Sequence, residues 1–270
     1  MRPREIVEFY RKHGPRIFRN ELGQRSLLRI FHRKFSSLPL QKALQDCFKE
    51  KTLADSTKRL VIPAYNLDDD NVYVFKTRHH QRLMRDHRVE MWKVGMATTA
   101  APTYFRSFSG VDGVRLIDGG VWANNPTMVA IAEAHSVLGV PLSSIHVMSI
   151  GTTEPIVHRK RRLDAGGLLA WCRSAPDVLM KGQSVGTNNQ AIHLLGKEKV
   201  FRVDVRVPEG VFALDKPAIE ALFGKAAGTS REVSPRFELE FRCHVAAAFA
   251  PIRTKSEETI NVPDGAGDDQ

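Results

Sequence analysis

The chain has 270 residues, of which 42% are hydrophobic and 26% charged, a composition typical of globular proteins. It contains no apolar run of the roughly 18 residues that a membrane-spanning helix needs. Its N-terminus lacks the apolar region of a secretory signal, so we expect neither a membrane span nor export. The three cysteines are too far apart for a disulfide framework or a metal pattern, and we expect reduced thiols in a cytoplasmic protein: Cys47, Cys172 and Cys243.

The net charge of +10 is concentrated in two stretches. Residues 1–35 hold ten Lys or Arg against three acidic residues, and residues 158–162 read HRKRR. Such stretches attract anionic lipid headgroups, nucleic acid or acidic partners. Neither zinc-finger spacing nor an aromatic-rich strand accompanies them, which argues against nucleic acid. Solvated helix faces explain the charge equally simply, so the charge alone decides little.

Hydrophobic periodicity predicts helices and strands along the whole chain. Residues 58–77 read as two strands joined by an acidic turn at 68–71, hence a hairpin. Strand, helix and strand over 114–150 fit a right-handed crossover, and strands without clean alternation favour a mostly parallel sheet. The other predicted elements are helices at 3–14, 38–50, 89–105, 166–196, 216–226 and 236–248, and a strand at 200–205.

The stretch RLIDGGVWANNP, residues 115–126, places an acidic residue where a strand ends. In open α/β sheets, catalytic groups lie beyond the carboxyl ends of strands. Gly119 and Gly120 give the backbone freedom for a close approach. Asp118 could therefore act as a general base for a nearby nucleophile. It could equally belong to an Asp-Gly turn that caps the next helix, and the local pattern does not separate the two.

Four blocks in order resemble the patatin-like phospholipases. They read VIPAYNLDDDNVYVFKT (61–77), VGMATTAAPTYF (94–105), LIDGGVWANNP (116–126) and HVMSIGTTE (146–154). The resemblance implies an α/β chain with a three-layer α/β/α fold over residues 1–250, core blocks within 58–154, and a polar, disordered tail at 251–270. It also implies hydrolysis of lipid acyl esters by a Ser–Asp dyad without a cofactor. Asp118 of the Asp118-Gly119-Gly120 motif then accepts the proton of the serine.

The rest of the family's catalytic pattern is absent from this sequence. Before Asp118 there is neither a G-x-S-x-G nucleophile turn nor a G-G-x-R oxyanion loop. The resemblance therefore leads us to expect a chain that begins after the nucleophile and is inactive by itself. The alternative is a catalytically dead remnant that binds lipid or an acidic partner. Either form is expected in the cytoplasm, with membrane-surface contact through the basic N-terminal region.

One literal G-x-S-x-G occurs at residues 182–186 and contains Ser184. The motif marks a nucleophile only where a strand precedes it and a helix follows. The residues before it have helical spacing, and it follows Asp118 in the chain, the reverse of the family order. We therefore interpret Ser184 as a false match.

The remaining candidates have simpler structural explanations. Asn124 and Asn125 are expected either to shape the site or to cap the next helix. No suitably spaced third ligand accompanies the histidines at 79, 80 and 87, so they do not predict a metal site. The acids at 68–70 lack the twelfth-position Glu of a calcium loop and fit a solvated hairpin tip. Met91, Trp92 and Met96 are most simply core.

Overall fold

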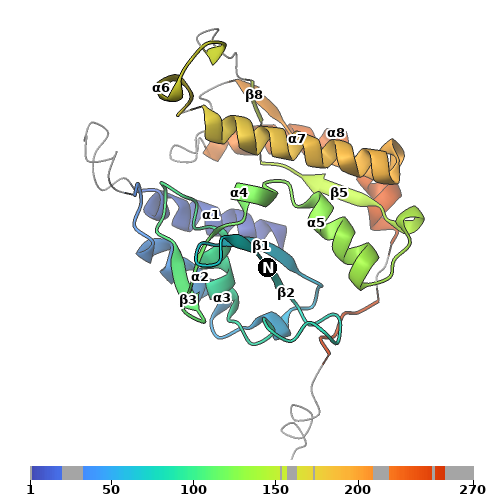
Figure 1. Ribbon diagram of the computed structural model, residues 1–270. Coiled ribbons are helices and arrows are strands. Elements are labelled where there is room, and N and C mark those ends of the chain that lie inside the picture. The colour runs from blue at the N-terminus through green and yellow to red at the C-terminus, as the bar shows by residue number, and fades with distance from the viewer. Residues whose placement is uncertain are drawn as a thin grey trace, which may run out of the picture.

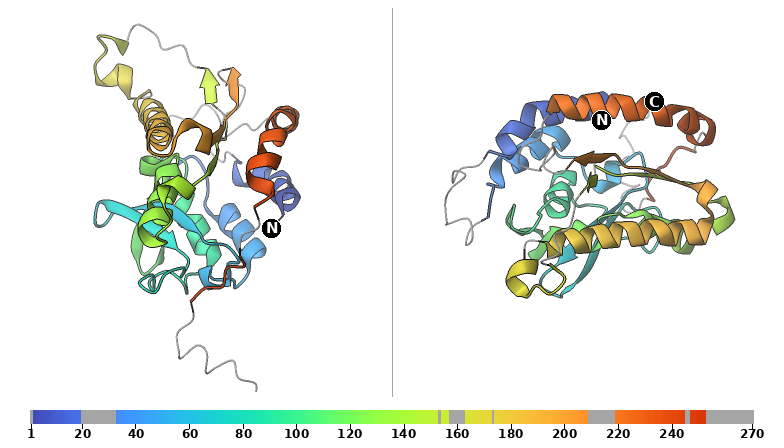
Figure 2. Two further views of the ribbon diagram at one scale, coloured as in Figure 1. Left: turned by 90° about the vertical axis from the view of Figure 1, so that its right-hand side faces the viewer. Right: turned by 90° about the horizontal axis from the view of Figure 1, so that it is seen from above.

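The computed structural model describes residues 2–19, 33–152, 154–156, 163–172, 174–208, 219–244 and 247–252. Figures 1 and 2 show a mixed arrangement of helices and strands. The predicted α/β class is thereby confirmed. The α-helices are α1 (Pro3–Ile17), α2 (Leu38–Phe48), α3 (Met91–Thr98), α4 (Gly120–Ala123), α5 (Thr127–Ala132), α6 (Leu168–Trp171), α7 (Ala175–Leu195) and α8 (Ile219–Phe237). The strands are β1 (Val61–Asn66), β2 (Asn71–Lys76), β3 (Phe108–Val111), β4 (Val114–Asp118), β5 (Val147–Ile150), β6 (Glu154–Ile156), β7 (Val200–Val203) and β8 (Arg206–Pro208).

Four strands form a sheet in the order β2-β1-β4-β3, and every neighbouring pair in it is antiparallel. The expectation of a mostly parallel sheet is wrong for these strands, because two hairpins build them. The predicted hairpin β1–β2 is present. The second hairpin, β3–β4, turns at Asp112 (φ 50°) and Gly113 (φ 73°), a two-residue turn with positive φ at both positions. Asp-Gly favours this turn, whose twist matches that of the strands.

Parallel pairing occurs, within the described ranges, in two small sheets, β5–β7 and β6–β8. The predicted crossover from β4 to β5 is therefore wrong, since β4 pairs with β1 and β3 whereas β5 pairs with β7. Around β7 the arrangement is layered. Ala191 and Leu195 of α7 pack with Val200, and Arg236 of α8 lies 4.5 Å from the ring centroid of Phe201. This part of the chain thus has the α/β/α layering that the resemblance implies (Figure 2).

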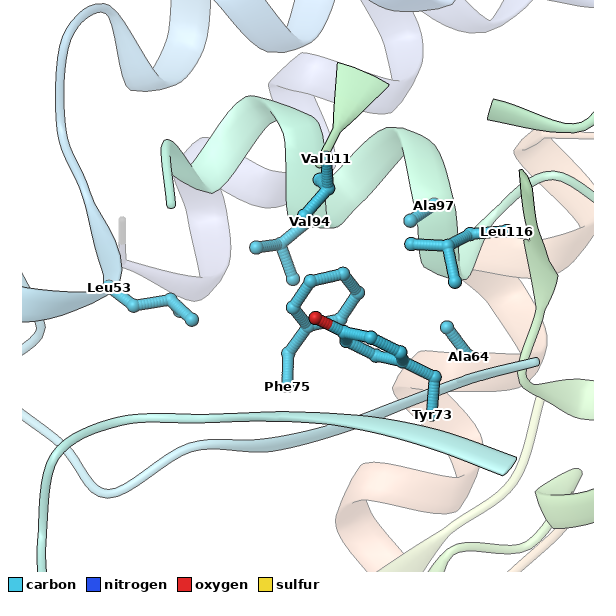
Figure 3. Packing of buried hydrophobic residues seen from close by; sticks show 8 residues of the cluster. All are labelled: Leu53, Ala64, Tyr73, Phe75, Val94, Ala97, Val111 and Leu116. Atoms are coloured by element: carbon cyan, nitrogen blue, oxygen red, sulfur yellow. The ribbon is translucent and has the colours of Figure 1, made fainter. Parts of the chain in front are cut away.

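The core beside the four-stranded sheet forms between that sheet and α3. Its strand residues alternate along the strands, so they share one face, and Val94 and Ala97 of α3 lie one helical turn apart. Figure 3 shows Tyr73 and Phe75 facing α3, with ring centroids 4.7 Å apart. The cluster comprises Leu53, Ala64, Tyr73, Phe75, Val94, Ala97, Val111 and Leu116. This core fixes the register of β4, and with it the position of Asp118.

A second, aromatic cluster joins α1 and α2 to the other side of α3. Met96 is buried in it, as expected, and Trp92 packs against its edge, while Met91 is half-buried. Phe35 packs against the rings of Phe18 and Phe105. The basic N-terminal helix therefore buries Gly14 and Ile17 near its C-terminal end, and its other residues are exposed or half-buried.

The C-terminal helices differ from the prediction. The segment 166–196 is divided into α6 and α7, and α8 is one helix that continues into the π-helical turn η7 (Glu238–Arg242), where two helices were expected. Two predicted features lie outside the described residues, namely the HRKRR stretch and nearly all of the expected tail.

Candidate functional site

Asp118 is the last residue of β4, and backbone contacts hold it in place. It pairs with Ala64 of β1 across the sheet, and its N–H donates to the carbonyl oxygen of Ala100, just beyond α3, at 3.1 Å. Its side chain is half-buried. The strand end is thus fixed by backbone bonds to a neighbouring strand and to the chain that follows α3.

Burial determines the electrostatics of Asp118. Desolvation disfavours the charged form and raises the pKa of the Asp118 carboxyl above its ordinary value. The N–H of Gly120 donates to Oδ1 at 2.7 Å, which stabilises the carboxylate and partly opposes the shift. Because burial is the larger cause, Asp118 binds a proton more strongly than an exposed aspartate does. That property suits a proton acceptor.

Gly119 allows β4 to end directly against β1. A Cβ at this position would overlap the carbonyl carbon and oxygen of Pro63. The same Pro63 oxygen accepts a hydrogen bond from Oγ1 of Thr98 at 2.7 Å, and Nε1 of Trp122 donates to the Ala64 oxygen at 2.8 Å. The backbone of β1 is therefore held from two sides, and any side chain at position 119 displaces the carboxylate beside it.

We expect Gly119→Ala to lower the free energy of unfolding by about 1–3 kcal/mol, the usual cost of forcing extra atoms into a packed site. Gly182→Ala is the matched control, since a Cβ there meets nothing within 4 Å and Gly182 lies inside α7. That control should stabilise by up to about 1 kcal/mol, because alanine is the better helix former. Denaturant titration of both variants measures the difference, and equal stability would contradict the close approach of Gly119.

Asn125 fixes the loop after Asp118, whereas Asn124 is exposed. Only 1% of Asn125 is exposed, and its Oδ1 accepts from the N–H of Thr127 at 3.2 Å and from Oγ1 of Thr127 at 2.6 Å. Its Nδ2 donates to the Ser184 carbonyl oxygen at 3.1 Å. Asn125 therefore binds the first residue of α5 and also joins the Asp118 loop to α7.

The network extends to residues that the sequence analysis did not single out. Oγ1 of Thr127 lies 2.9 Å from Oγ of Ser149 on β5. Arg202 on β7 donates to that Ser149 oxygen at 2.8 Å and to Oδ2 of Asp204 at 2.6 Å. The sequence does indicate this contact, because Ser149 and Arg202 are each a polar residue within an otherwise apolar strand. Buried polar groups of this kind need partners, and here each supplies one to the other.

Ser184 lies in the interior of α7, which begins nine residues earlier at Ala175. A nucleophile turn requires a preceding strand, and residues 175–183 are helical instead. The contact between this segment and the Asp118 loop runs through the carbonyl oxygen of Ser184 and the side-chain amide of Gln183, which accepts from the Asn125 N–H at 3.3 Å.

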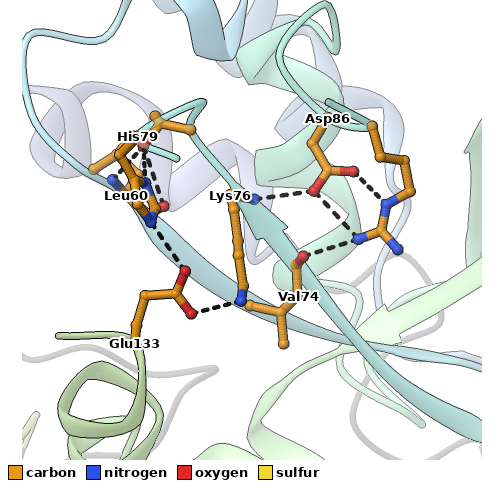
Figure 4. Close-up of polar contacts among 8 residues, drawn as sticks. Leu60, Val74, Lys76, His79, Asp86 and Glu133 are labelled. Carbon is orange, nitrogen blue, oxygen red and sulfur yellow. Dashed lines mark hydrogen bonds and ion pairs between the residues drawn. The ribbon is translucent and has the colours of Figure 1, made fainter. Parts of the chain in front are cut away.

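His79 belongs to a buried ionic network rather than to a metal site (Figure 4). Its Nε2 lies 2.9 Å from Oε1 of Glu133, and its Nδ1 lies 2.9 Å from Oγ1 of Thr77. Because a carboxylate only accepts, Nε2 carries the hydrogen. Lys76 binds the other oxygen of Glu133 at 2.5 Å. Within the described residues, no group of three His, Cys, Asp or Glu side chains is placed to hold a metal ion.

The acidic turn between β1 and β2 uses its carboxylates for protein contacts. Asp68 accepts from the backbone N–H and from Nε of Arg115, and these bonds lower the pKa of its carboxyl. Asp69 accepts from Nδ2 of Asn66 at 2.7 Å, and Asp70 accepts from a tyrosine hydroxyl. Each of these three carboxylates thus accepts a hydrogen bond from another residue of the chain, which fits the predicted hairpin tip.

Comparison with known proteins gives a consistent set of matches. Residues 1–131 match the family model described as patatin-like phospholipase. A "cGAMP-activated phospholipase" of Pseudomonas aeruginosa is 30% identical over 278 residues, covering 97% of this chain and 80% of that protein. A protein of the same name from Vibrio cholerae is 30% identical over 164 residues, 55% of this chain and 46% of its own length. The "Probable inactive patatin-like protein 9" of Arabidopsis thaliana is 29% identical over 140 residues, 48% of this chain and 35% of that protein.

Proposed function

The chain belongs to the patatin-like phospholipase family, and we propose from this that its Asp118 is the general base of a lipid acyl hydrolase. The observation that carries the proposal is the placement of Asp118. It is a half-buried carboxylate with a raised pKa, fixed at a strand end and followed by the close-approaching Gly119. Each of these features favours a positioned proton acceptor.

In the proposed reaction a serine hydroxyl attacks the carbonyl carbon of a phospholipid or other lipid acyl ester. Asp118 accepts the hydroxyl proton as the bond forms, and the alcohol part of the lipid leaves with that proton. Water then attacks the acyl-enzyme and gives a proton to Asp118, which passes it to the serine oxygen as the bond to the acyl group breaks and the fatty acid is released. The reaction uses no metal or organic cofactor.

The proposal places the serine on a segment that these 270 residues do not contain. No G-x-S-x-G precedes Asp118 in the sequence, and the single later match lies in the middle of α7. A serine in a helix interior lacks the sharp strand-to-helix turn that exposes a nucleophile. The chain alone is therefore proposed to be inactive.

We propose a cytoplasmic protein that meets its substrate at a membrane surface. Among the described residues, none of the helices combines the length and the apolar character needed to cross a bilayer. In the basic N-terminal region, Arg4, Lys12 and Arg16 of α1 are exposed. Cationic side chains near an anionic membrane surface are attracted to it.

The second candidate is a non-catalytic protein that retains the fold and binds lipid or an acidic partner. The absence of a nucleophile motif from the sequence favours it, and so does the similarity to a relative whose name calls it inactive. Ester hydrolysis separates the two candidates.

The test compares the 270-residue chain with a form extended by the codons upstream of Met1. We expect no turnover of a nitrophenyl ester or of phospholipid vesicles by the chain alone, and hydrolysis by the extended form. The assay is run with and without cGAMP, because two relatives are named for activation by it. Turnover by the chain alone that disappears in Ser184→Ala would show that the serine assignment is wrong. An inactive extended form would favour the non-catalytic candidate.

A further inference from the structure

Arg202 is a charged residue within the apolar strand β7, and its side chain is mostly buried. Only 22% of that side chain is exposed. Its Nη2 donates to Oδ2 of Asp204 at 2.6 Å, and its Nη1 donates to Oγ of Ser149 at 2.8 Å. Ser149 and Arg202 are also paired residues in the parallel register of β5 and β7. The Asp204 carboxylate and the strand register therefore hold the guanidinium where it donates to Ser149.

The polar atoms beyond Ser149 form a chain of hydrogen bonds with a defined direction. A guanidinium only donates, so Oγ of Ser149 accepts from Arg202. An amide oxygen only accepts, so the 2.6 Å contact between Oγ1 of Thr127 and Oδ1 of Asn125 uses the one hydroxyl hydrogen of Thr127. The 2.9 Å contact between the two hydroxyls then uses the hydrogen of Ser149. These bonds run from Arg202 to Asn125, and we call them the Arg202 chain.

The Arg202 chain fixes the orientation of the Asn125 amide. With Oδ1 turned to the donors of Thr127, Nδ2 faces the carbonyl oxygen of Ser184 on α7 at 3.1 Å. The opposite orientation would set Nδ2 against the N–H of Thr127 and Oδ1 against the Ser184 oxygen, two contacts that cannot be hydrogen bonds. Because only 1% of Asn125 is exposed, leaving its polar atoms unpaired is costly. The amide therefore has one favourable orientation.

One short helix separates Asn125 from Asp118. The N–H of Gly120, the first residue of α4, donates to Oδ1 of Asp118 at 2.7 Å. The helix has only four residues and ends two residues before Asn125. Asn125 thus anchors the far end of the helix whose first N–H binds the carboxylate, and a movement of Asn125 moves that donor.

We propose that Arg202 is a positioning residue for the proposed base, acting through the Arg202 chain on the loop that holds Asp118. The inference rests on the proposed function, because only there does the exact position of Asp118 matter. Arg202 stays charged at every pH at which the enzyme would work, so the direction of the chain does not change with pH. Without the guanidinium, Ser149 loses its donor, the Asn125 amide loses its fixed orientation, and the loop is held less firmly.

The first test needs no hydrolysis and uses the 270-residue chain. Carboxyl ¹³C shifts are followed through a pH titration, and the Asp118 signal is identified by its absence in Asp118→Asn. Arg202→Met and Ser149→Ala should each lower the titration midpoint of Asp118, because a loosened loop admits water and burial is the main cause of the raised pKa. Loss of a nearby cation alone would raise that midpoint, so the expected direction separates positioning from charge. An unchanged or raised midpoint in Ser149→Ala, which keeps the cation, would overturn the proposal.

The second test measures hydrolysis in the form of the protein that contains the serine. Arg202→Met and Ser149→Ala should each lower kcat by about 10–100-fold with little change in KM, the effect of misplacing a catalytic group by about 1 Å. The double variant should be no slower than Arg202→Met, because both residues act along one path. Multiplied losses in the double variant would contradict action through Ser149.

Arg236→Met is the matched control. Arg236 lies 4.5 Å from the ring centroid of Phe201, the residue before Arg202, which faces the other side of β7. This variant should lower the Tm but leave both kcat and the Asp118 midpoint unchanged. Equal effects of Arg236→Met and Arg202→Met would reduce Arg202 to a role in stability and overturn the proposal. Full hydrolysis by Asp118→Asn would instead reject the proposed function, while the carboxyl titration still decides whether Arg202 positions the loop.

Discussion

Asp118→Asn is expected to reduce ester hydrolysis by about 10³–10⁴-fold in the form of the protein that contains the serine. Removing the acid of a catalytic Ser-containing site has effects of this size in other hydrolases. Asparagine retains the shape of the side chain and the hydrogen bond from Gly120, but it does not accept the serine proton at neutral pH. Steady-state kinetics on vesicles and on a nitrophenyl ester measure the change, with Ser184→Ala as the control that should retain full activity.

The same variant should not be less stable at pH 7. Burial raises the pKa of Asp118, so the folded chain holds the proton of this group more strongly than the unfolded chain does. The resulting stabilisation is complete below the unfolded pKa of about 3.9 and is lost as the pH rises through the folded pKa. At pH 7 the folded state therefore carries the cost of a buried charge, which asparagine removes. The Tm of Asp118→Asn at pH 7 should be equal to or above that of the unchanged protein.

The rate of ester hydrolysis should also reflect the raised pKa of Asp118. The base acts only when ionised, so the rate should fall as the pH drops through the raised pKa of Asp118, and this fall should begin at a higher pH than an exposed aspartate would give. Retention of near-normal turnover by Asp118→Asn, or a lower Tm at pH 7, would count against the assignment of Asp118 as a buried base.

Glu133→Ala is expected to cost about 3–5 kcal/mol of unfolding free energy, the usual effect of breaking a buried ion pair by removing one partner. The Glu133 side chain is 8% exposed and binds both Lys76 and His79, and the His79 side chain is fully buried. Alanine leaves Lys76 and His79 without their acceptor and leaves a cavity between β2 and the π-helical turn η3 (Glu133–Val137). Chemical denaturation followed by far-UV circular dichroism measures the loss.

An exposed glutamate provides the matched control. Glu238 also forms an ion pair, with Arg242 at 2.6 Å, but both side chains are largely in water. Glu238→Ala should change stability by less than about 0.5 kcal/mol, because solvent screens exposed pairs. If the two variants lose similar stability, the network around Glu133 does not stabilise the fold in the way that its burial indicates.

Local patterns predicted the elements near Asp118 well and the pairing of strands poorly. The strand 114–117 and the hairpin at 58–77 follow from alternation and turn residues, which are local properties. The pairing of β4 with β1 is a contact between distant residues, and no local pattern encodes it. Asp112-Gly113 is a sequence typical of a hairpin turn and could have predicted β3. The antiparallel pairing of β3 with β4 contradicts the mostly parallel sheet that we expected.

The candidate site likewise combines residues that a local pattern predicts with contacts that it does not. The motif predicts Asp118 as the base, and the place of Asn125 before α5 predicts a contact with the start of that helix. The contacts of Asn125 could not be identified, because Ser184 on α7 and Ser149 on β5 lie on elements that only tertiary packing brings next to it. The sequence predicts a close approach at Gly119 but not what approaches it, which is the backbone of Pro63 on another strand.

The antiparallel order of the sheet has a consequence for the way this chain folds. Each hairpin closes over a few residues and can form early, because short loops cost little entropy. Ala64 and Asp118 are 54 residues apart in the chain, so the pairing that positions the carboxylate requires the two hairpins to come together. Proton-accepting geometry at Asp118 thus depends on contacts between distant parts of the chain, and amide exchange at Asp118, whose N–H donates to Ala100, should report the docking of β4 against the segment that follows α3.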